Sequence, residues 1–247
     1  MQEKEIRVLT PDGEMRTFTV HPDGAGPYPV AVLYMDGVGY REQVKANARR
    51  FAAAGYYVVA PDLYYRMGEL VLDLKDESAR EKIMQAARSV SPENAVDDTK
   101  AVLRGIASDP AAAKGPKVCV GYCMGARISL RAASALPDEF VAAAGIHPGA
   151  LVTDKPDSPH NDLAGVRGEL YFAFAEIDRT ATPETIDRFR QEMERRGIRG
   201  EVERLPGVTH GFAMADLQVY DRAAAEGHFQ KVLELWDRNV KTGASAT

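Results

Sequence analysis

The chain has 247 residues, 45% of them hydrophobic, and a formal net charge of −5 at pH 7. A chain of this length can bury one substantial core, and no Pro/Gly/Ser-rich linker or repeat divides it, so we predict a single domain over residues 1–240 and a disordered tail over residues 241–247. Its basic residues are scattered among acidic ones, which argues against a nucleic-acid surface. No apolar stretch approaches the roughly 20 residues that a membrane-spanning helix needs.

The chain has two cysteines, Cys119 and Cys123. With Cys119 in a strand and Cys123 in the turn after it, a disulfide between them would need an unfavourable local geometry. No cluster of cysteine and histidine suggests zinc, and the N-terminus lacks the basic and apolar regions of a signal peptide. We therefore expect a cytoplasmic protein with free thiols and with no metal or cofactor.

The predicted strands begin with an antiparallel pair. Residues 5–20 are expected to form two strands around a Pro-Asp-Gly turn. Apolar runs then predict six further strands, at residues 30–34, 55–64, 117–121, 140–147, 169–176 and 201–206. Continuous apolar runs, in place of alternating ones, are typical of parallel strands that are covered on both faces.

Helical patterns follow most of these strands. They lie at residues 41–54, 76–88, 124–135 and 220–240. Two more helix starts are marked by Ser91-Pro92 and Thr182-Pro183, where a hydroxyl residue at the N-cap precedes a proline. Alternating strands and helices after an antiparallel opening predict an α/β fold, with a doubly wound, mostly parallel sheet and helices on both faces.

The sequence GYCMG at residues 121–125 lies where a predicted strand meets a predicted helix. A nucleophile elbow is such a turn, and glycines two positions to either side of the nucleophile let the backbone approach closely without a Cβ clash. Cys123 would be the nucleophile. The amide of Met124, at the helix N-terminus, could donate to an oxyanion. The alternative is a glycine-lined turn with an incidental cysteine.

A thiol nucleophile needs a base, and the base needs an orienting carboxylate. In hydrolases with a nucleophile elbow, the chain order is nucleophile, then acid, then histidine. Asp178 follows the strand at residues 169–176, and His210 lies in a glycine-flanked loop after the next strand. Order and placement predict a triad of Cys123, Asp178 and His210. Glu176 is the alternative acid, less favoured because it lies closer to the strand.

The other four histidines divide into two groups. His21, near the first strands, and His228, in the terminal helix, are interpreted as structural residues. His147 ends a predicted strand and His160 lies in a proline-rich loop, and for both a role at the cleft stays open.

Four motifs resemble those of the dienelactone hydrolase family, a branch of the α/β-hydrolases. They are GYYVVAPDLY at residues 55–64, GYCMGAR at 121–127, AEIDRTATPE at 175–184 and GVTHGFA at 207–213. The resemblance runs through nearly the whole chain, and the spacing between the motifs also matches. It implies a Cys-His-Asp triad, carried over to Cys123, His210 and Asp178. It also implies an oxyanion hole formed by the amides of Met124 and Gly37.

The pocket positions depart from the family pattern. Members that act on dienelactone carry a glutamate that bonds the resting thiol, where this chain has the shorter Asp36; it either holds the thiol or caps a turn. Those members also use two arginines for the substrate's carboxylate. Arg80 is close to the place of one, and Met214 stands where the other would fall. Since a thioether cannot replace a guanidinium clamp, we expect a less polar substrate. Tyr64, after a strand end, is expected to line the pocket.

These observations predict a hydrolase of carboxylic ester or lactone bonds that acts through a thioester on Cys123. Its partner would be a small molecule, with no nucleic acid or membrane. Two alternatives stay open: a non-catalytic ligand-binding or scaffold protein with this fold, and a thiol peptidase or acyltransferase on the same scaffold.

Overall fold

The computed structural model describes residues 1–68, 70 and 78–240. The chain divides into two compact units, residues 1–115 and residues 116–247. The predicted tail over residues 241–247 and the beginning of the predicted helix at 76–88 lie outside the described residues. The single domain over residues 1–240 stays a prediction.

Four strands form the sheet of the first unit. They are β1 (Gln2–Thr10), β2 (Gly13–His21), β3 (Val30–Tyr34) and β4 (Tyr57–Pro61). β1 and β2 form an antiparallel hairpin, and β2 runs antiparallel to β4. β3 and β4 are parallel, with Val30 opposite Tyr57. The order within this unit is therefore β1-β2-β4-β3.

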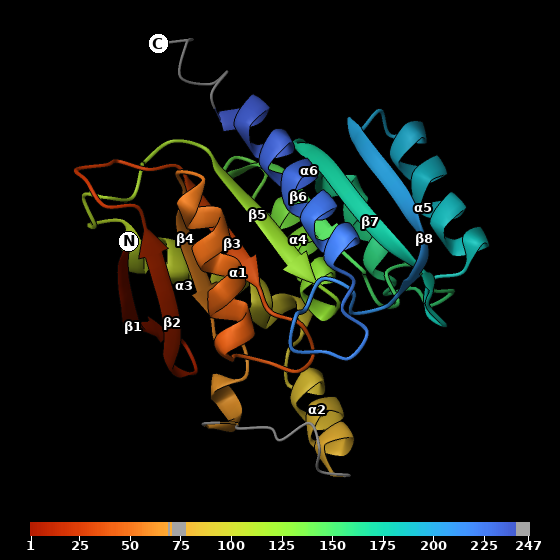
Figure 1. Cartoon of the computed structure of the whole chain (residues 1–247), viewed down its shortest axis with the longest axis horizontal. Coiled ribbons are helices and arrows are strands. Elements are labelled where there is room, and N and C mark those ends of the chain that lie inside the picture. Colours follow the sequence, from red (N-terminus) through yellow and green to blue (C-terminus); the bar gives the residue numbers. More distant parts are fainter. Residues whose placement is uncertain (69, 71–77, 241–247) are drawn as a thin grey trace. The chain divides into compact units, whose positions relative to one another are not determined.

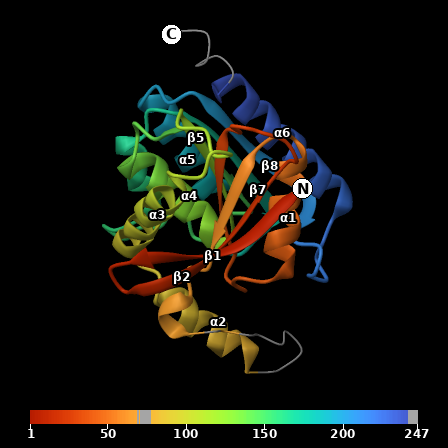
Figure 2. The ribbon, with the colours of Figure 1, turned by 90° about the vertical axis from the view of Figure 1, so that its left-hand side faces the viewer.

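Among the described residues of the first unit, three α-helices and one 3₁₀ helix accompany this sheet. They are α1 (Glu42–Ala53), η1 (Tyr65–Met67), α2 (Ala79–Arg88) and α3 (Pro92–Ile106). Figure 2 shows α1 and α3 on opposite sides of the strands. The Ser91 side chain accepts a hydrogen bond from the Asn94 amide, 3.2 Å away, as its N-cap position requires. The helix start at Ser91-Pro92 is confirmed.

Four parallel strands form the sheet of the second unit. They are β5 (Lys117–Tyr122), β6 (Phe140–Ile146), β7 (Glu169–Ile177) and β8 (Gly200–Thr209), paired in chain order. Parallel neighbours place their carboxyl ends at one edge, where ligand sites of open α/β sheets lie. All residues placed in the predicted triad follow these carboxyl ends.

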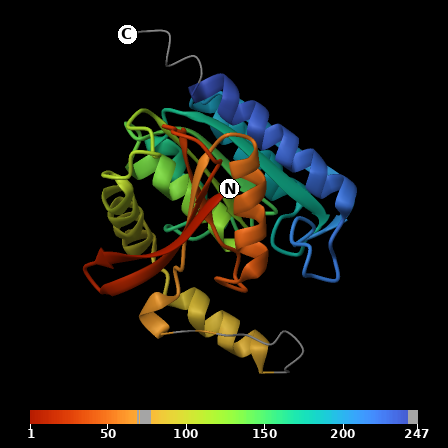
Figure 3. The ribbon, with the colours of Figure 1, turned by 60° about the vertical axis from the view of Figure 1, so that its left-hand side comes forward.

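The helices of the second unit cover both faces of its strands. They are α4 (Met124–Ala135), η2 (Pro159–Gly165), α5 (Pro183–Arg195) and α6 (Arg222–Val240). In Figure 1, α6 lies in front of the strands and α4 behind them. Figure 3 shows α6 running along this sheet. The helix start at Thr182-Pro183 is confirmed, because the Thr182 side chain accepts from the Thr185 amide.

The apolar runs of the sequence in the second unit form the strands and helix faces of its buried core. Phe172 in β7 is fully buried and packs at a tilt against Phe189 of α5, with ring centroids 5.0 Å apart. Trp236 of α6 is fully buried as well. Complete burial of one large apolar side chain contributes about 1.5–3 kcal/mol. Buried strands with helices on both faces confirm the predicted α/β architecture.

Of the six strands predicted from apolar runs, two differ in length from their predictions by more than one residue. The strand predicted at residues 55–64 ends at Pro61, because Asp62 accepts from the Tyr64 amide and so turns the chain into η1. The strand predicted at residues 201–206 extends over Gly200–Thr209. Its charged residues are tolerated because β8 is largely exposed, and its backbone stays paired with β7 up to Thr209.

Candidate active site

The turn between β5 and α4 has the geometry of a nucleophile elbow. Cys123 has φ of 52° and ψ of −110°, a conformation that L-residues rarely adopt. A Cβ added to Gly121 would lie 1.9 Å from the carbonyl oxygen of Gly125. The first glycine is therefore required because the backbone of α4 passes directly over it. This close approach explains the glycine before the cysteine.

Cys123 is held by its backbone and remains partly accessible. Its amide donates to the Ile146 carbonyl oxygen at 3.0 Å, and its carbonyl accepts from Ala126 at 3.2 Å. The side chain has intermediate exposure, and Met124 begins α4 immediately after it. The backbone thus fixes the sulfur at the N-terminal end of α4, where the side chain stays partly accessible.

His210 bridges the sulfur and a carboxylate. Its Nε2 atom lies 3.0 Å from Sγ of Cys123, and its Nδ1 atom lies 2.6 Å from Oδ2 of Asp178. The backbone amide of His210 donates to Ile177, which ties the loop after β8 to the end of β7. The structure thus brings Cys123, His210 and Asp178 together in the predicted order.

The electrostatic environment favours a protonated His210. Burial acts to lower the pKa of His210, but the hydrogen bonds with Asp178 and Cys123 outweigh burial and raise it to about 10. Burial acts to raise the pKa of Asp178, whereas the hydrogen bonds from His210 and Thr180 lower it below its ordinary value. The two shifts have the same origin, because each charge stabilises the other.

Asp178 is fixed by three hydrogen bonds. While Oδ2 faces His210, Oδ1 accepts from the backbone amide of Thr180 at 2.7 Å and from its hydroxyl at 2.8 Å. The Asp178 side chain is only 4% exposed. The alternative acid, Glu176, instead accepts from the Gly207 amide at 2.7 Å and pairs with Arg204 at 3.0 Å.

His147 is fully buried beside the base. Its ring centroid lies 5.0 Å from that of His210 in an edge-on arrangement, and its backbone φ is 40°. Among residues 1–68, 70 and 78–240, neither ring nitrogen of His147 has a hydrogen-bond partner. Burial lowers the pKa of His147 well below its usual value, and the nearby His210 and His228 act in the same direction. A neutral imidazole therefore packs against the base.

The remaining histidines have structural surroundings. His21 stacks on Tyr57 with ring centroids 5.3 Å apart. His228 is buried, and its Nε2 atom lies 3.1 Å from the Tyr122 hydroxyl. The Nδ1 atom of His160 lies 2.6 Å from the Ser158 hydroxyl. Their surroundings support the structural interpretation of His21 and His228 and extend it to His160.

In the loop after β3, Asp36 is paired with Arg41, not with the thiol. Arg41 donates to both oxygens of Asp36, at 2.6 and 3.0 Å, and the Val38 amide donates at 3.1 Å. Of the two interpretations of Asp36, the structure therefore supports the turn cap. The Tyr64 side chain is buried, and its hydroxyl donates to the Gly37 carbonyl at 2.9 Å. An oxyanion role for Gly37 and a pocket role for Tyr64 stay predictions.

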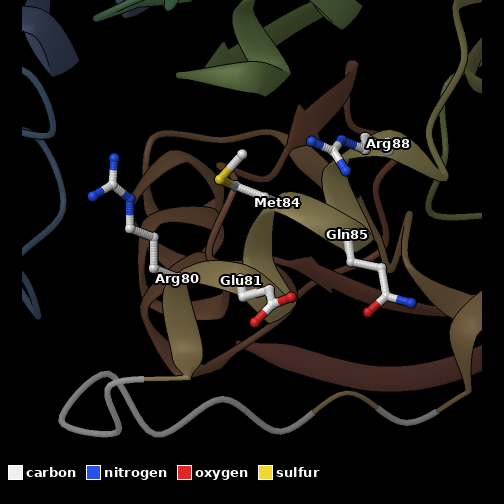
Figure 4. Close-up of a pocket in the computed structure, with 5 residues that line it drawn as sticks. All are labelled: Arg80, Glu81, Met84, Gln85 and Arg88. Atoms are coloured by element: carbon white, nitrogen blue, oxygen red, sulfur yellow. The ribbon is translucent and has the colours of Figure 1, made fainter.

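The other two predicted pocket residues differ in exposure. Met214 is fully buried, whereas Arg80 is exposed on α2. Figure 4 shows Arg80, Met84 and Arg88 on one side of α2 and Glu81 and Gln85 on the other. These five residues line a surface hollow of about 690 Å³. Substrate contacts of Arg80 and Met214 stay predictions.

The sequence analysis did not predict two polar partners, Thr180 of Asp178 and Arg41 of Asp36. Thr180 carries a detectable signal, because Asp-x-Thr favours a turn in which the carboxylate accepts from the amide two residues on. Arg41 carries none, since nothing in its neighbourhood distinguishes it from a surface arginine before a helix. Both cysteines are free, as expected from their spacing.

Within the described ranges, no group of three or more His, Cys, Asp or Glu side chains is arranged to hold a metal ion. In that same part of the chain, none of the helices combines the length and apolar character that crossing a membrane requires.

Strand pairing, helices on both faces and a strained elbow beneath a bridging histidine define an α/β-hydrolase. The profile of the dienelactone hydrolase family matches residues 15–239, so the chain belongs to this family of hydrolases. This family membership confirms the resemblance seen in the motifs.

Sequence and structure comparisons agree with this assignment. A protein of Methylorubrum extorquens named "Putative carboxymethylenebutenolidase" is 25% identical over 238 residues, which cover 95% of this chain and 80% of that protein. The solved structure of a "Putative Dienelactone Hydrolase" from Klebsiella pneumoniae has a TM-score of 0.84 and 20% identity over 95% of this chain and 97% of its own. A dienelactone hydrolase-like promiscuous phosphotriesterase from metagenomic libraries has a TM-score of 0.78 and 18% identity, covering 97% and 99%. These structural likenesses confirm the fold.

Proposed function

We propose that this chain hydrolyses carboxylic ester or lactone bonds through a thioester on Cys123. The observation that carries the proposal is the line of hydrogen bonds from Sγ to Nε2 at 3.0 Å and from Nδ1 to Asp178 at 2.6 Å. Acyl transfer by a thiol requires a nucleophile, a base and an orienting acid in this order. Family membership supports hydrolysis as the overall reaction.

We propose that Cys123 and His210 form an ion pair in the resting enzyme. With a pKa of about 10, His210 carries a proton at neutral pH. We propose that this proton comes from the nucleophile, whose Sγ lies 3.0 Å from Nε2. Arg41 already occupies both oxygens of Asp36. We therefore propose that His210, and not Asp36, is the partner of the thiolate in the resting enzyme.

Acylation begins when the thiolate attacks the carbonyl carbon of the substrate. The carbonyl oxygen becomes an oxyanion, and we assign its binding to the Met124 amide at the start of α4; one such donor is typically worth about 3–4 kcal/mol. The C–O bond then breaks, and the leaving alkoxide takes the proton from Nε2 of His210. The product of this step is a thioester on Cys123 and a neutral imidazole.

Deacylation returns the same groups to their starting state. Neutral His210 accepts a proton from water, and the resulting hydroxide attacks the thioester carbonyl. The C–S bond breaks, the carboxylic acid leaves, and the thiolate forms again beside the imidazolium. Asp178 stabilises the imidazolium in both half-reactions, since its charge faces Nδ1 throughout.

The substrate class follows from the pocket positions. Met214 is uncharged, and a thioether cannot clamp a carboxylate as an arginine does. We therefore propose small esters or lactones without a carboxylate at that position, and only weak activity on dienelactone. Two free cysteines, one of them a nucleophile, suit a reducing compartment, and we propose the cytoplasm.

A panel of short-chain p-nitrophenyl esters and lactones tests this function. We expect turnover by the wild type, a loss of at least about 10³-fold in Cys123→Ala, and an acyl adduct on Cys123 in quenched samples analysed by mass spectrometry. Matched amides and acyl acceptors in the same panel separate hydrolysis from peptidase or transferase activity. Full esterase activity in Cys123→Ala would reject the proposal, and no turnover in the wild type would favour a binding protein.

A further inference from the structure

The carboxylate of Asp178 has a second anchor besides the base. Thr180 donates to Oδ1 twice, from its backbone amide at 2.7 Å and from its hydroxyl at 2.8 Å. Oδ2 is thereby left for Nδ1 of His210. The plane of the carboxylate is fixed from both sides, because each oxygen has its own donor.

The same hydroxyl holds the segment that follows β6. The Ala150 amide donates to the Thr180 hydroxyl at 3.1 Å, and Ala150 has a φ of 49°. Alanine in this region is strained, so the segment needs a contact that holds it. A Cβ built on neighbouring Gly149 would lie 3.4 Å from Cε1 of His210 and 3.8 Å from Sγ of Cys123. The segment therefore lies directly against the reacting pair.

We propose that Thr180 is a positioning residue of the reaction, whose hydroxyl orients Asp178 and fixes the segment at residues 147–150 against Cys123 and His210. This inference rests on the proposed function for its catalytic meaning. It goes beyond the triad, because it assigns a residue outside the nucleophile, base and acid.

The hydroxyl acts through a chain of bonded groups. The Ala150 amide donates to Thr180, the Thr180 hydroxyl donates to Asp178, and Asp178 accepts from His210. A hydrogen bond to a carboxylate stabilises its charged form, which in turn stabilises the imidazolium. When the hydroxyl is removed, Oδ1 of Asp178 loses one of its donors and the Ala150 amide loses its acceptor. The segment should then lose its fixed position beside Cys123 and His210.

Valine at position 180 tests the hydroxyl with little change in shape. Thr180→Val keeps the backbone amide that donates to Asp178 and removes the hydroxyl alone. Thr180→Ser keeps a hydroxyl and should behave as the wild type. Thr182→Val is the matched control, because Thr182 lies in the same loop and its hydroxyl caps α5 without contacting Asp178.

The main readout is the titration of the His210 ring, followed by NMR in protein with labelled histidine. We expect the midpoint to fall in Thr180→Val by about half a pH unit or more, since it loses one hydrogen bond to the paired carboxylate. The kcat/KM for an ester should fall about 5- to 30-fold, because the acid and the segment beside the nucleophile lose the contact that positions them. Thr182→Val should lower the melting temperature without moving the midpoint.

An unchanged His210 midpoint in Thr180→Val, or an equal change in Thr182→Val, would overturn the proposal. Failure of Thr180→Ser to restore the wild-type values would do the same. If Thr180→Val does not fold, Thr180→Ala serves in its place. The titration needs no turnover, so a wild type that hydrolyses no ester would reject the proposed function while the coupling of Thr180 to His210 is still measured.

Discussion

The Nε2 atom of His210 lies 3.0 Å from Sγ of Cys123, although the two residues are 87 positions apart in the chain. Parallel pairing produces this proximity, because β5 and β8 both end at the same edge of the sheet of the second unit. Cys123 follows β5, and His210 follows β8 directly. The parallel strands therefore bring the two residues to the same edge of the sheet, and the short loops after the strands set their exact positions.

The pKa values of the neighbouring rings of His210 and His147 should be shifted in opposite directions from the usual histidine value. We expect the ring of His210 to remain protonated to about pH 10 and the ring of His147 to stay neutral below its ordinary midpoint. Hydrogen bonds to Asp178 and Cys123 cause the first shift, and burial causes the second. NMR spectra of labelled histidine between pH 5 and 11, assigned with His210→Gln and His147→Phe, measure both midpoints on the usual histidine scale of about 6.5.

The raised pKa of His210 also makes stability depend on pH. Its value in the folded protein lies above the unfolded value, so its stabilising contribution is complete below about pH 6.5 and is lost as the pH rises towards 10. The difference in melting temperature between wild type and His210→Gln should therefore shrink from neutral to alkaline pH. A constant difference over this range would contradict the assigned ion pair.

The two acids at the end of β7 should differ sharply in their effect on activity. Asp178→Asn removes the charge beside Nδ1 and permits the wrong imidazole tautomer, so we expect kcat/KM to fall by about 10²- to 10⁴-fold. Glu176→Gln alters the contacts with Gly207 and Arg204, which lie outside the predicted triad. Its kcat/KM should stay within about two-fold of wild type, as for a surface change. Ester hydrolysis by the two purified variants measures the contrast. Equal losses would show that the acid has been assigned to the wrong carboxylate.

Alanine should have opposite effects on stability at two glycines. In Gly121→Ala the added Cβ would meet the Gly125 carbonyl oxygen at 1.9 Å, and backbone must shift; we expect a loss of about 3 kcal/mol or failure to fold. Gly227 lies exposed within α6, with nothing within 4 Å of an added Cβ. Gly227→Ala should raise the free energy of unfolding by about 0.5–1 kcal/mol. Urea unfolding of the two variants measures both changes, and an unaffected Gly121→Ala would contradict the close approach.

The site residues that could be predicted from the sequence are those that directly follow a strand. Cys123, Asp178 and His210 each follow a strand of recognisable apolar pattern, and chain order then assigns their roles. Arg41 could not be predicted as the partner of Asp36, because that pair depends on how one loop folds back on itself. The role of His147 is open for the same reason: strand periodicity places it at a strand end, while its burial depends on packing against Phe212, after β8, and Tyr122.

Gly149 offers a way to narrow the space above the nucleophile without disturbing the fold. Its backbone φ lies outside the left-handed region, and an added methyl would meet Cε1 of His210 at 3.4 Å and Sγ of Cys123 at 3.8 Å. These are ordinary contacts, so Gly149→Ala should fold and melt like the wild type. The methyl would nevertheless occupy part of the approach to the sulfur, and we expect kcat/KM for a branched acyl group to fall about 10-fold, as one misplaced methyl does in a fitted pocket.

Comparing acetyl with branched acyl esters separates this steric effect from a change in the nucleophile itself. Acetyl esters should lose less activity than branched ones in Gly149→Ala, because the small acyl group leaves room for the methyl. The His210 titration should keep its midpoint near 10, since the methyl adds no charge or hydrogen bond. If acetyl and branched esters lose activity equally, or if neither loses any, the segment at residues 147–150 does not border the path of the acyl group.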